Sequence, residues 1–225
     1  RQQVAHAVGL VHAGPAQATV GGRGGACAAL HACVTFNDPD LARFRRENAV
    51  EIARKQIILK PESFRMKKQT IYGSPLVDVA ANMELVRETV EICKVILELT
   101  NWDIRLLSKS NLLPKVAQAL DSMNGAASRA QAAMRVIYGV STGTLDDGIA
   151  AAIEGGTAKV SKRFESLHWL QDNGFRTFGM LCPSLPQDDY VEFAWSMSKA
   201  LRVEKLEHVW AEVINARGES FKRTE

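Results

Sequence analysis

The stretch Asn101-Trp-Asp-Ile-Arg-Leu-Leu-Ser-Lys-Ser110 decides the fold class of this 225-residue chain. Its apolar residues predict a buried strand over 103–108, which closes on a small polar cluster with Lys109 at its centre. A helix is predicted directly afterwards, from Asn111 to Leu120. This order is typical of parallel α/β proteins, in which ligands bind at the carboxyl ends of the strands. Lys109 is therefore a candidate binding residue, and the alternative is an ordinary lysine in a surface loop.

The same plan of strand, turn and helix repeats along the chain. Strands are predicted near residues 70–74, 103–108, 135–141, 175–181 and 208–214. Helical patterns lie between them, so the intervals match βα units. A sixth strand would precede the first helix. The pattern predicts an α/β fold with parallel strands inside and helices outside, closer to a partial barrel than to a closed eight-fold one.

Local signals place the helices between these strands. Asn82 is predicted to cap a strongly amphipathic helix that runs through Leu99. The other predicted helices run to about Ile58 after Asp38-Pro39-Asp40, over 161–172 before the cap Asn173-Gly174, and from Asp188 or Asp189 to about Leu201. The Ala- and Ser-rich residues 124–133 are expected to form a loose connection.

Composition limits the classes of protein that this chain can represent. Hydrophobic residues make up 46% of the chain and charged residues 24%, as in ordinary globular proteins. A net charge of +3 is too small to indicate nucleic-acid binding by itself. No apolar run approaches the roughly 20 residues of a membrane helix, and no signal peptide is visible, so we expect a cytoplasmic protein that does not bind membranes.

The first 37 residues differ from the rest of the chain. They are rich in Ala and Gly, contain no acidic residue, and show no sustained helical or strand period. We expect residues 1–37 to be poorly ordered or non-native sequence, and residues 38–225 to form the domain.

The predicted strand ends carry motifs that resemble a known family in a familiar order. The motifs are Ile71-Tyr-Gly-Ser-Pro-Leu-Val-Asp78, Leu106-Leu-Ser-Lys-Ser110, Tyr138-Gly-Val-Ser-Thr-Gly-Thr144, Lys162-Arg163 with Trp169-Leu170 and Asn173-Gly174, and Ala211-Glu-Val-Ile-Asn215. Together they resemble the radical S-adenosylmethionine superfamily, in the branch similar to spore photoproduct lyase. The resemblance implies a partial (βα)6 TIM-like barrel and a lyase-like enzyme. It also implies a 4Fe–4S cluster that cleaves S-adenosylmethionine reductively to start radical chemistry.

The resemblance also implies which residues bind the cofactor. In this branch a lysine ending the third strand and a serine ending the fourth face S-adenosylmethionine, and these match Lys109 and Ser141. An ammonium group can pair with the methionyl carboxylate, and a hydroxyl can bond to its polar groups. Ser74 and Asp78 match positions that contact the cofactor's amino group or the substrate.

Two further residues are expected to line the same cavity. Glu212 and Asn215 close the last strand, although both also suit an ordinary polar loop. The sequence does not identify the substrate. A nucleic-acid-related substrate follows by analogy alone, because a shared fold does not carry the substrate with it.

The cluster motif is where the sequence departs from the family. The family uses Cys-x-x-x-Cys-x-x-Cys, because three thiolates on one loop must reach three irons of one cube. Here the region reads Cys27-Ala-Ala-Leu-His-Ala-Cys33, which puts His31 and Val34 at the second and third ligand positions. Cys27 and Cys33 are thus weak metal ligands out of register, and chance explains them better. No second metal or acid–base group is visible.

Two accounts of the missing motif are possible. In the first, which we favour, the chain is a fragment whose N-terminal part is damaged or frameshifted, and the native enzyme carries the three cysteines. In the second, the protein has lost its cluster and is a degenerate barrel that acts as a binding module. The remaining cysteines support neither account, since Cys93 is predicted to pack in the core and Cys182 lacks a neighbouring base.

Overall fold

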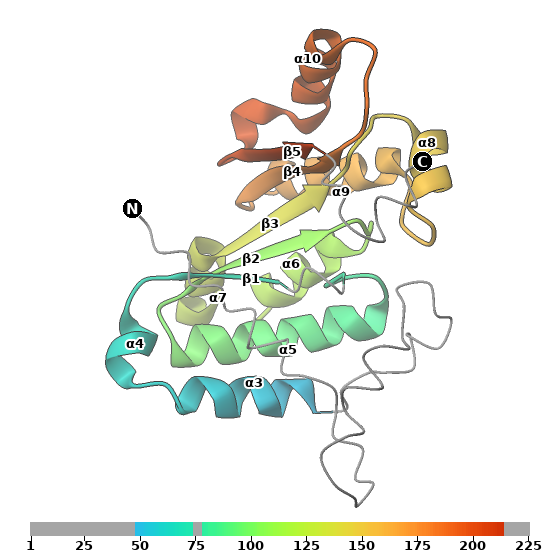
Figure 1. The fold of residues 1–225 in the computed structure, drawn as a ribbon. Helices are drawn as coiled ribbons and strands as arrows, with labels where there is room; N and C mark the ends of the chain where they lie inside the picture. The colour runs from blue at the N-terminus through green and yellow to red at the C-terminus, as the bar shows by residue number, and fades with distance from the viewer. Residues whose placement is uncertain (1–47, 74–77, 214–225) are drawn as a thin grey trace, which may run out of the picture.

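A five-stranded parallel sheet with the strand order β1-β2-β3-β4-β5 forms the centre of the molecule (Figure 1). The structure is a computed structural model, and it describes residues 48–73 and 78–213. The strands are β1 Thr70–Tyr72, β2 Asp103–Ser108, β3 Val136–Ser141, β4 Thr177–Ser184 and β5 Val209–Val213. They curl into a half-barrel with the helices on the outside (Figure 1). The prediction of adjacent parallel strands in a partial barrel is confirmed.

Each strand pairs with its sequence neighbours in a parallel register. Ile71 lies opposite Ile104, Ser108 opposite Val140, and Ser141 opposite Met180. This regular order is typical of short βα connections, which usually join parallel strands that are neighbours in the sheet. The sixth strand expected before the first helix lies outside the described residues.

The helices connect the strands and cover the outer face of the sheet (Figure 1). They are α3 Ala49–Ile58, α4 Glu62–Met66, α5 Met83–Leu99, α6 Leu113–Asp121, α7 Ala126–Arg135, α8 Asp147–Ile153, α9 Val160–Asp172 and α10 Tyr190–Leu201, followed by a 3₁₀ turn at Val203–Lys205. Within residues 48–73 and 78–213, none of the helices has the length and apolar character that a membrane span requires.

Capping side chains determine where several helices begin. Asn82 accepts hydrogen bonds from the amides of Glu84 and Leu85, so α5 starts as predicted. Asp189 caps α10 in the same way. The cap that the sequence places at Asp38 lies outside the described residues.

The segment 124–133 is a correction to the sequence analysis, because most of it is helical. Helix α7 covers Ala126–Arg135 and follows Gly125, whose φ of 90° suits glycine. Alanine has the highest helix propensity, and this favours a helix without a strongly apolar face. The side chain of Arg135 anchors the end of α7 by donating to the carbonyl oxygens of Leu97 and Trp102. Composition alone therefore did not identify this helix.

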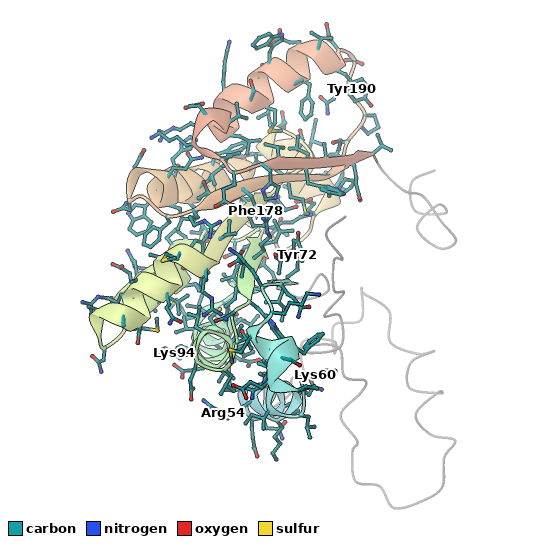
Figure 2. All side chains as sticks on the ribbon, turned by 90° about the vertical axis from the view of Figure 1, so that its left-hand side faces the viewer. Arg54, Lys60, Tyr72, Lys94, Phe178 and Tyr190 are labelled. Atoms are coloured by element: carbon teal, nitrogen blue, oxygen red, sulfur yellow. The ribbon has the colours of Figure 1, made fainter. Side chains whose placement is uncertain are left out.

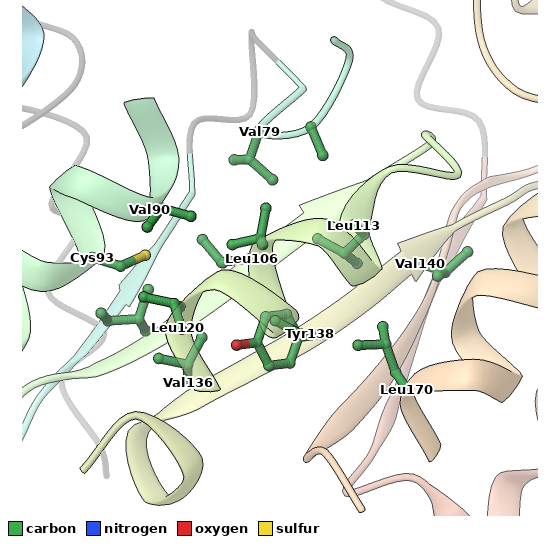
Figure 3. Close-up of a cluster of buried hydrophobic side chains, with 14 of the residues drawn as sticks. Val79, Val90, Cys93, Leu106, Leu113, Leu120, Val136, Tyr138, Val140 and Leu170 are labelled. Atoms are coloured by element: carbon green, nitrogen blue, oxygen red, sulfur yellow. The ribbon is translucent and has the colours of Figure 1, made fainter. Parts of the chain in front are cut away.

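Alternation along the strands divides the side chains between two environments. On β3, Val136, Tyr138 and Val140 belong to the apolar core between the sheet and the outer helices (Figure 3). The intervening Ile137, Gly139 and Ser141 therefore face the inner side of the half-barrel. The same core contains Cys93, and burial raises the pKa of its thiol to about 12. This thiol is a packing group, as the sequence predicted.

Candidate functional site

The carboxyl ends of β2 and β3 bring two of the sequence-predicted residues side by side. Ser108 pairs with Val140, so the next positions along the two strands, Lys109 and Ser141, are neighbours at the edge of the sheet. The alternation of β3 turns Ser141 toward the inner side of the half-barrel. A cation and a hydroxyl therefore meet at the edge where parallel α/β proteins bind ligands.

Asp78 holds the end of β2 in place. Its Oδ1 accepts hydrogen bonds from the hydroxyl of Ser108, at 2.7 Å, and from the amide of Ala80, at 2.8 Å. Its Oδ2 accepts a third from the amide of Lys109, at 2.6 Å. These bonds fix the backbone that carries Lys109. The structure thus places Asp78 beside Lys109, but its carboxylate oxygens are engaged by the protein.

The Lys109 side chain reaches an acidic residue that the sequence analysis did not single out. Its ammonium pairs with Oε1 of Glu154, in the turn after α8. The other oxygen of Glu154, Oε2, accepts from Nη2 of Arg163 at 2.7 Å. The Lys109 side chain is 27% exposed, so the cation is partly open to solvent. One of its three N–H donors is used by Glu154, and the others can serve a ligand.

Arg163, on α9, connects this ion pair to the backbone of β3. Its side chain is fully buried. Besides Glu154, it donates to the carbonyl oxygens of Ala158, at 2.8 Å, and Ser141, at 2.9 Å, and to the hydroxyl of Thr157 at 2.7 Å. A buried guanidinium needs such a full set of acceptors, because an unpaired buried charge is strongly unfavourable. Arg163 therefore positions Ser141 and, through Glu154, Lys109.

The hydroxyl of Ser141 is buried but has no hydrogen-bond partner among the described residues. The residue is 3% exposed, and its Oγ makes no hydrogen bond within the part of the chain that the structure describes. The carbonyl of the same residue is held by Arg163, so the backbone is rigid while the hydroxyl can rotate. This hydroxyl can meet a polar group of a ligand without losing a contact to any described residue.

Cys182 and Glu212 lie near the same edge. Burial raises the pKa of the Cys182 thiol, and the negative charge of Glu212 raises it further, while the positive charge of Lys109 acts in the opposite direction. Glu212 is exposed on β5 and accepts a hydrogen bond from Nε1 of Trp210 at 3.0 Å. The strand ends therefore converge here, and Cys182 has the poor reactivity of a protonated thiol.

The described residues do not fit an iron–sulfur cluster. Within residues 48–73 and 78–213, no group of three or more His, Cys, Asp or Glu side chains could hold a metal ion. The described cysteines are Cys93, in the core, and Cys182. The predicted ligands Cys27 and Cys33 lie outside the described residues, as do Ser74 and Asn215. No step through a cluster follows from this geometry.

The fold is similar to solved structures of spore photoproduct lyase, a radical S-adenosylmethionine enzyme. A doubly substituted mutant of that enzyme, with bound AdoMet and dinucleoside spore photoproduct, matches with a TM-score of 0.56 and 11% identity, over 84% of this chain and 54% of that one. A singly substituted mutant with dinucleoside spore photoproduct matches with a TM-score of 0.51 and 12% identity, over 72% of this chain and 45% of that one. The chain thus spans about half the length of these structures. No family model and no curated protein matches the sequence.

This likeness confirms the partial barrel that the motifs implied, a half-barrel of parallel strands like that of spore photoproduct lyase. At 11–12% identity it carries the fold alone. The sequence around Glu154 contains no motif that would predict the role of this residue. Arg163 belongs to the recognised motif Lys162-Arg163, but helical periodicity could not show which of the two is buried.

Proposed function

We propose that the half-barrel binds S-adenosylmethionine at the carboxyl ends of β2 and β3. Lys109 donates to the methionyl carboxylate of the cofactor, and the Ser141 hydroxyl bonds to a nearby polar group. The observation that carries the proposal is the pairing of this partly open cation with a hydroxyl free of described partners on adjacent strands. A structure of the same fold with bound AdoMet supports it. Asp78 acts in the proposal by holding the Lys109 backbone.

The chemistry that follows from the resemblance is reductive cleavage of S-adenosylmethionine at a 4Fe–4S cluster. This reaction is proposed for an enzyme that carries the complete cluster motif. Among the described residues of this chain, no group of side chains could act as ligands of a cluster. What the described residues do is bind and orient: Glu154 and Arg163 hold Lys109 and Ser141 in a fixed relation. A nucleic-acid-related substrate has its support in the dinucleoside ligand of the structural neighbours.

Calorimetric titration with S-adenosylmethionine tests the binding proposal. Replacing Lys109 with Ala should weaken binding by roughly 1–3 kcal/mol, the range for a hydrogen bond to a charged group. Lys115→Ala is the matched control, because Lys115 is exposed on α6 and bonds to Gln118 at 3.2 Å. Equal affinity of the Lys109 variant and the wild-type chain would remove the proposed cofactor site.

Anaerobic reconstitution separates binding from cleavage. We expect the 225-residue chain not to release 5′-deoxyadenosine, because Cys27, His31 and Val34 cannot supply three thiolates. Electron paramagnetic resonance measures the cluster and chromatography measures the product. A stoichiometric 4Fe–4S signal with cofactor cleavage would show that the incomplete-motif argument is wrong.

A further inference from the structure

A second set of functional groups lies on the inner side of the half-barrel, deeper than Lys109. Alternation along β2 puts Arg105 on the inner face, three residues before the strand ends at Ser108, and Lys109 follows directly after the strand. Tyr72 lies opposite Arg105 in the sheet register. Tyr72 and Phe178 are near one another on this side of the sheet (Figure 2).

The guanidinium of Arg105 is surrounded by flat rings. Its Cζ is 5.9 Å from the ring centre of Tyr72 and 5.7 Å from that of Phe178. The ring of His208 is stacked on Phe178, with centres 5.2 Å apart and planes 8° apart. Nη1 of Arg105 donates to this imidazole, 2.7 Å from Nε2. These contacts hold the guanidinium plane in one orientation, as aromatic faces do for cations.

Arg105 is the inner-face cation whose charge no acidic residue among the described ones balances. Lys109 pairs with Glu154, and Asp103, on the same face as Arg105, pairs with Lys68 at 3.6 Å. His208 cannot balance the charge, because an imidazole is either neutral or cationic; burial and the Arg105 charge lower its pKa and so favour the neutral form. A positive charge held in a partly buried position without an anion is unfavourable, so an anionic ligand would stabilise it.

The hydrogen-bonding capacity of Arg105 is also incomplete. Within the described residues its buried Nε–H has no acceptor, and Nη2 makes no hydrogen bond. These two atoms form one edge of the guanidinium fork. That edge matches the two oxygens of a carboxylate or a phosphate, which is the strongest pairing available to arginine. The unused edge therefore indicates the chemistry of the missing partner.

We propose that Arg105 binds the carboxylate or phosphate of an organic anion that enters the inner side of the half-barrel. Tyr72 is 45% exposed, and Trp210, on the same inner side of β5, is 53% exposed, so a flat apolar part of the ligand can stack beside the anionic group. The identification of this ligand as the substrate rests on the proposed function. The binding of an anion at Arg105 does not depend on that function. The site deepens the proposal from an unknown substrate to an anionic one.

Titration of the full chain with two small probes tests the site in the absence of S-adenosylmethionine. Benzoate and phenyl phosphate represent the two anion classes, and benzyl alcohol is the neutral control. We expect at least one anion to bind, and Arg105→Gln to weaken it by about tenfold or more, equivalent to roughly 1.4 kcal/mol. Arg54→Gln is the matched variant, because Arg54 is a half-exposed arginine paired with Glu98 at 2.7 Å on the outer helices. Its anion binding should equal that of the wild type.

A spectroscopic readout does not depend on the folding of the Gln variant. The Nε–H resonance of Arg105, assigned by its loss in Arg105→Lys, should shift on addition of the anion that binds and stay fixed with benzyl alcohol. The tighter probe identifies the anion class. Absence of binding by both anions, equal binding by benzyl alcohol, or an unmoved Arg105 resonance would overturn the proposal. S-adenosylmethionine binding is measured separately, so either site can fail while the other succeeds.

Discussion

Removing the guanidinium of Arg163 should destabilise the protein strongly. Arg163→Met keeps an unbranched apolar stem but removes one fully buried charge and its four hydrogen bonds, to Glu154, Thr157, Ala158 and Ser141. Breaking a buried ion pair by removing one partner costs about 3–5 kcal/mol, because the other charge is left behind.

Two features of the structure act on this loss of stability in opposite directions. Glu154 retains Lys109 as a partner, which limits the loss for the carboxylate. The carbonyl oxygens of Ala158 and Ser141 lose a charged donor, at about 1–3 kcal/mol for each buried group left without a partner. The two effects oppose each other, so we expect a total loss of about 3–5 kcal/mol. For a chain of this size the corresponding fall in Tm is roughly 6–20 °C.

Urea unfolding followed by circular dichroism measures this loss. The control is Lys162→Met, one residue earlier on α9, whose exposed pair with Glu165 should contribute about 0–1 kcal/mol. A double-mutant cycle with Glu154→Gln isolates the pair energy. If R163M lost no more stability than K162M, the argument that Arg163 is a buried organiser of the site would be refuted.

Two further variants test the packing inside the half-barrel and the cap of one outer helix. Gly139→Ala should destabilise the protein by about 1–3 kcal/mol, because a Cβ at this position would lie 2.2 Å from the Phe178 ring. Adding Phe178→Leu to the Gly139→Ala variant should recover part of this loss. Equal stability of Gly139→Ala and the wild type in urea would contradict the prediction. Asn82→Ala should cost about 1 kcal/mol by removing the cap of α5, and an unchanged unfolding midpoint would show that the cap contributes nothing.

The sequence alone determined the order and direction of the elements. Apolar strands that end in polar clusters, separated by capped amphipathic helices, allow few arrangements, since short connections and right-handed crossovers make successive strands parallel neighbours. Lys109 and Ser141 could be placed at one edge for the same reason, and the registers agree. Helix α7 escaped prediction because its formation depends on alanine propensity and on the distant carbonyls that Arg135 reaches.

Only the tertiary structure decided which charges are paired. Glu154 meets Lys109 and Arg163 across 45 and 9 positions of sequence, and no local pattern encodes such a meeting. Alternation on β2 does put Arg105 on the inner face, but the His208 ring that it contacts belongs to a residue 103 positions away in the sequence. The periodicity of a strand or helix predicts on which face a residue lies, because the direction of each side chain follows from the backbone geometry. The partner on that face depends on how distant elements pack, and among the described residues of this half-barrel that packing left one arginine edge without an acceptor.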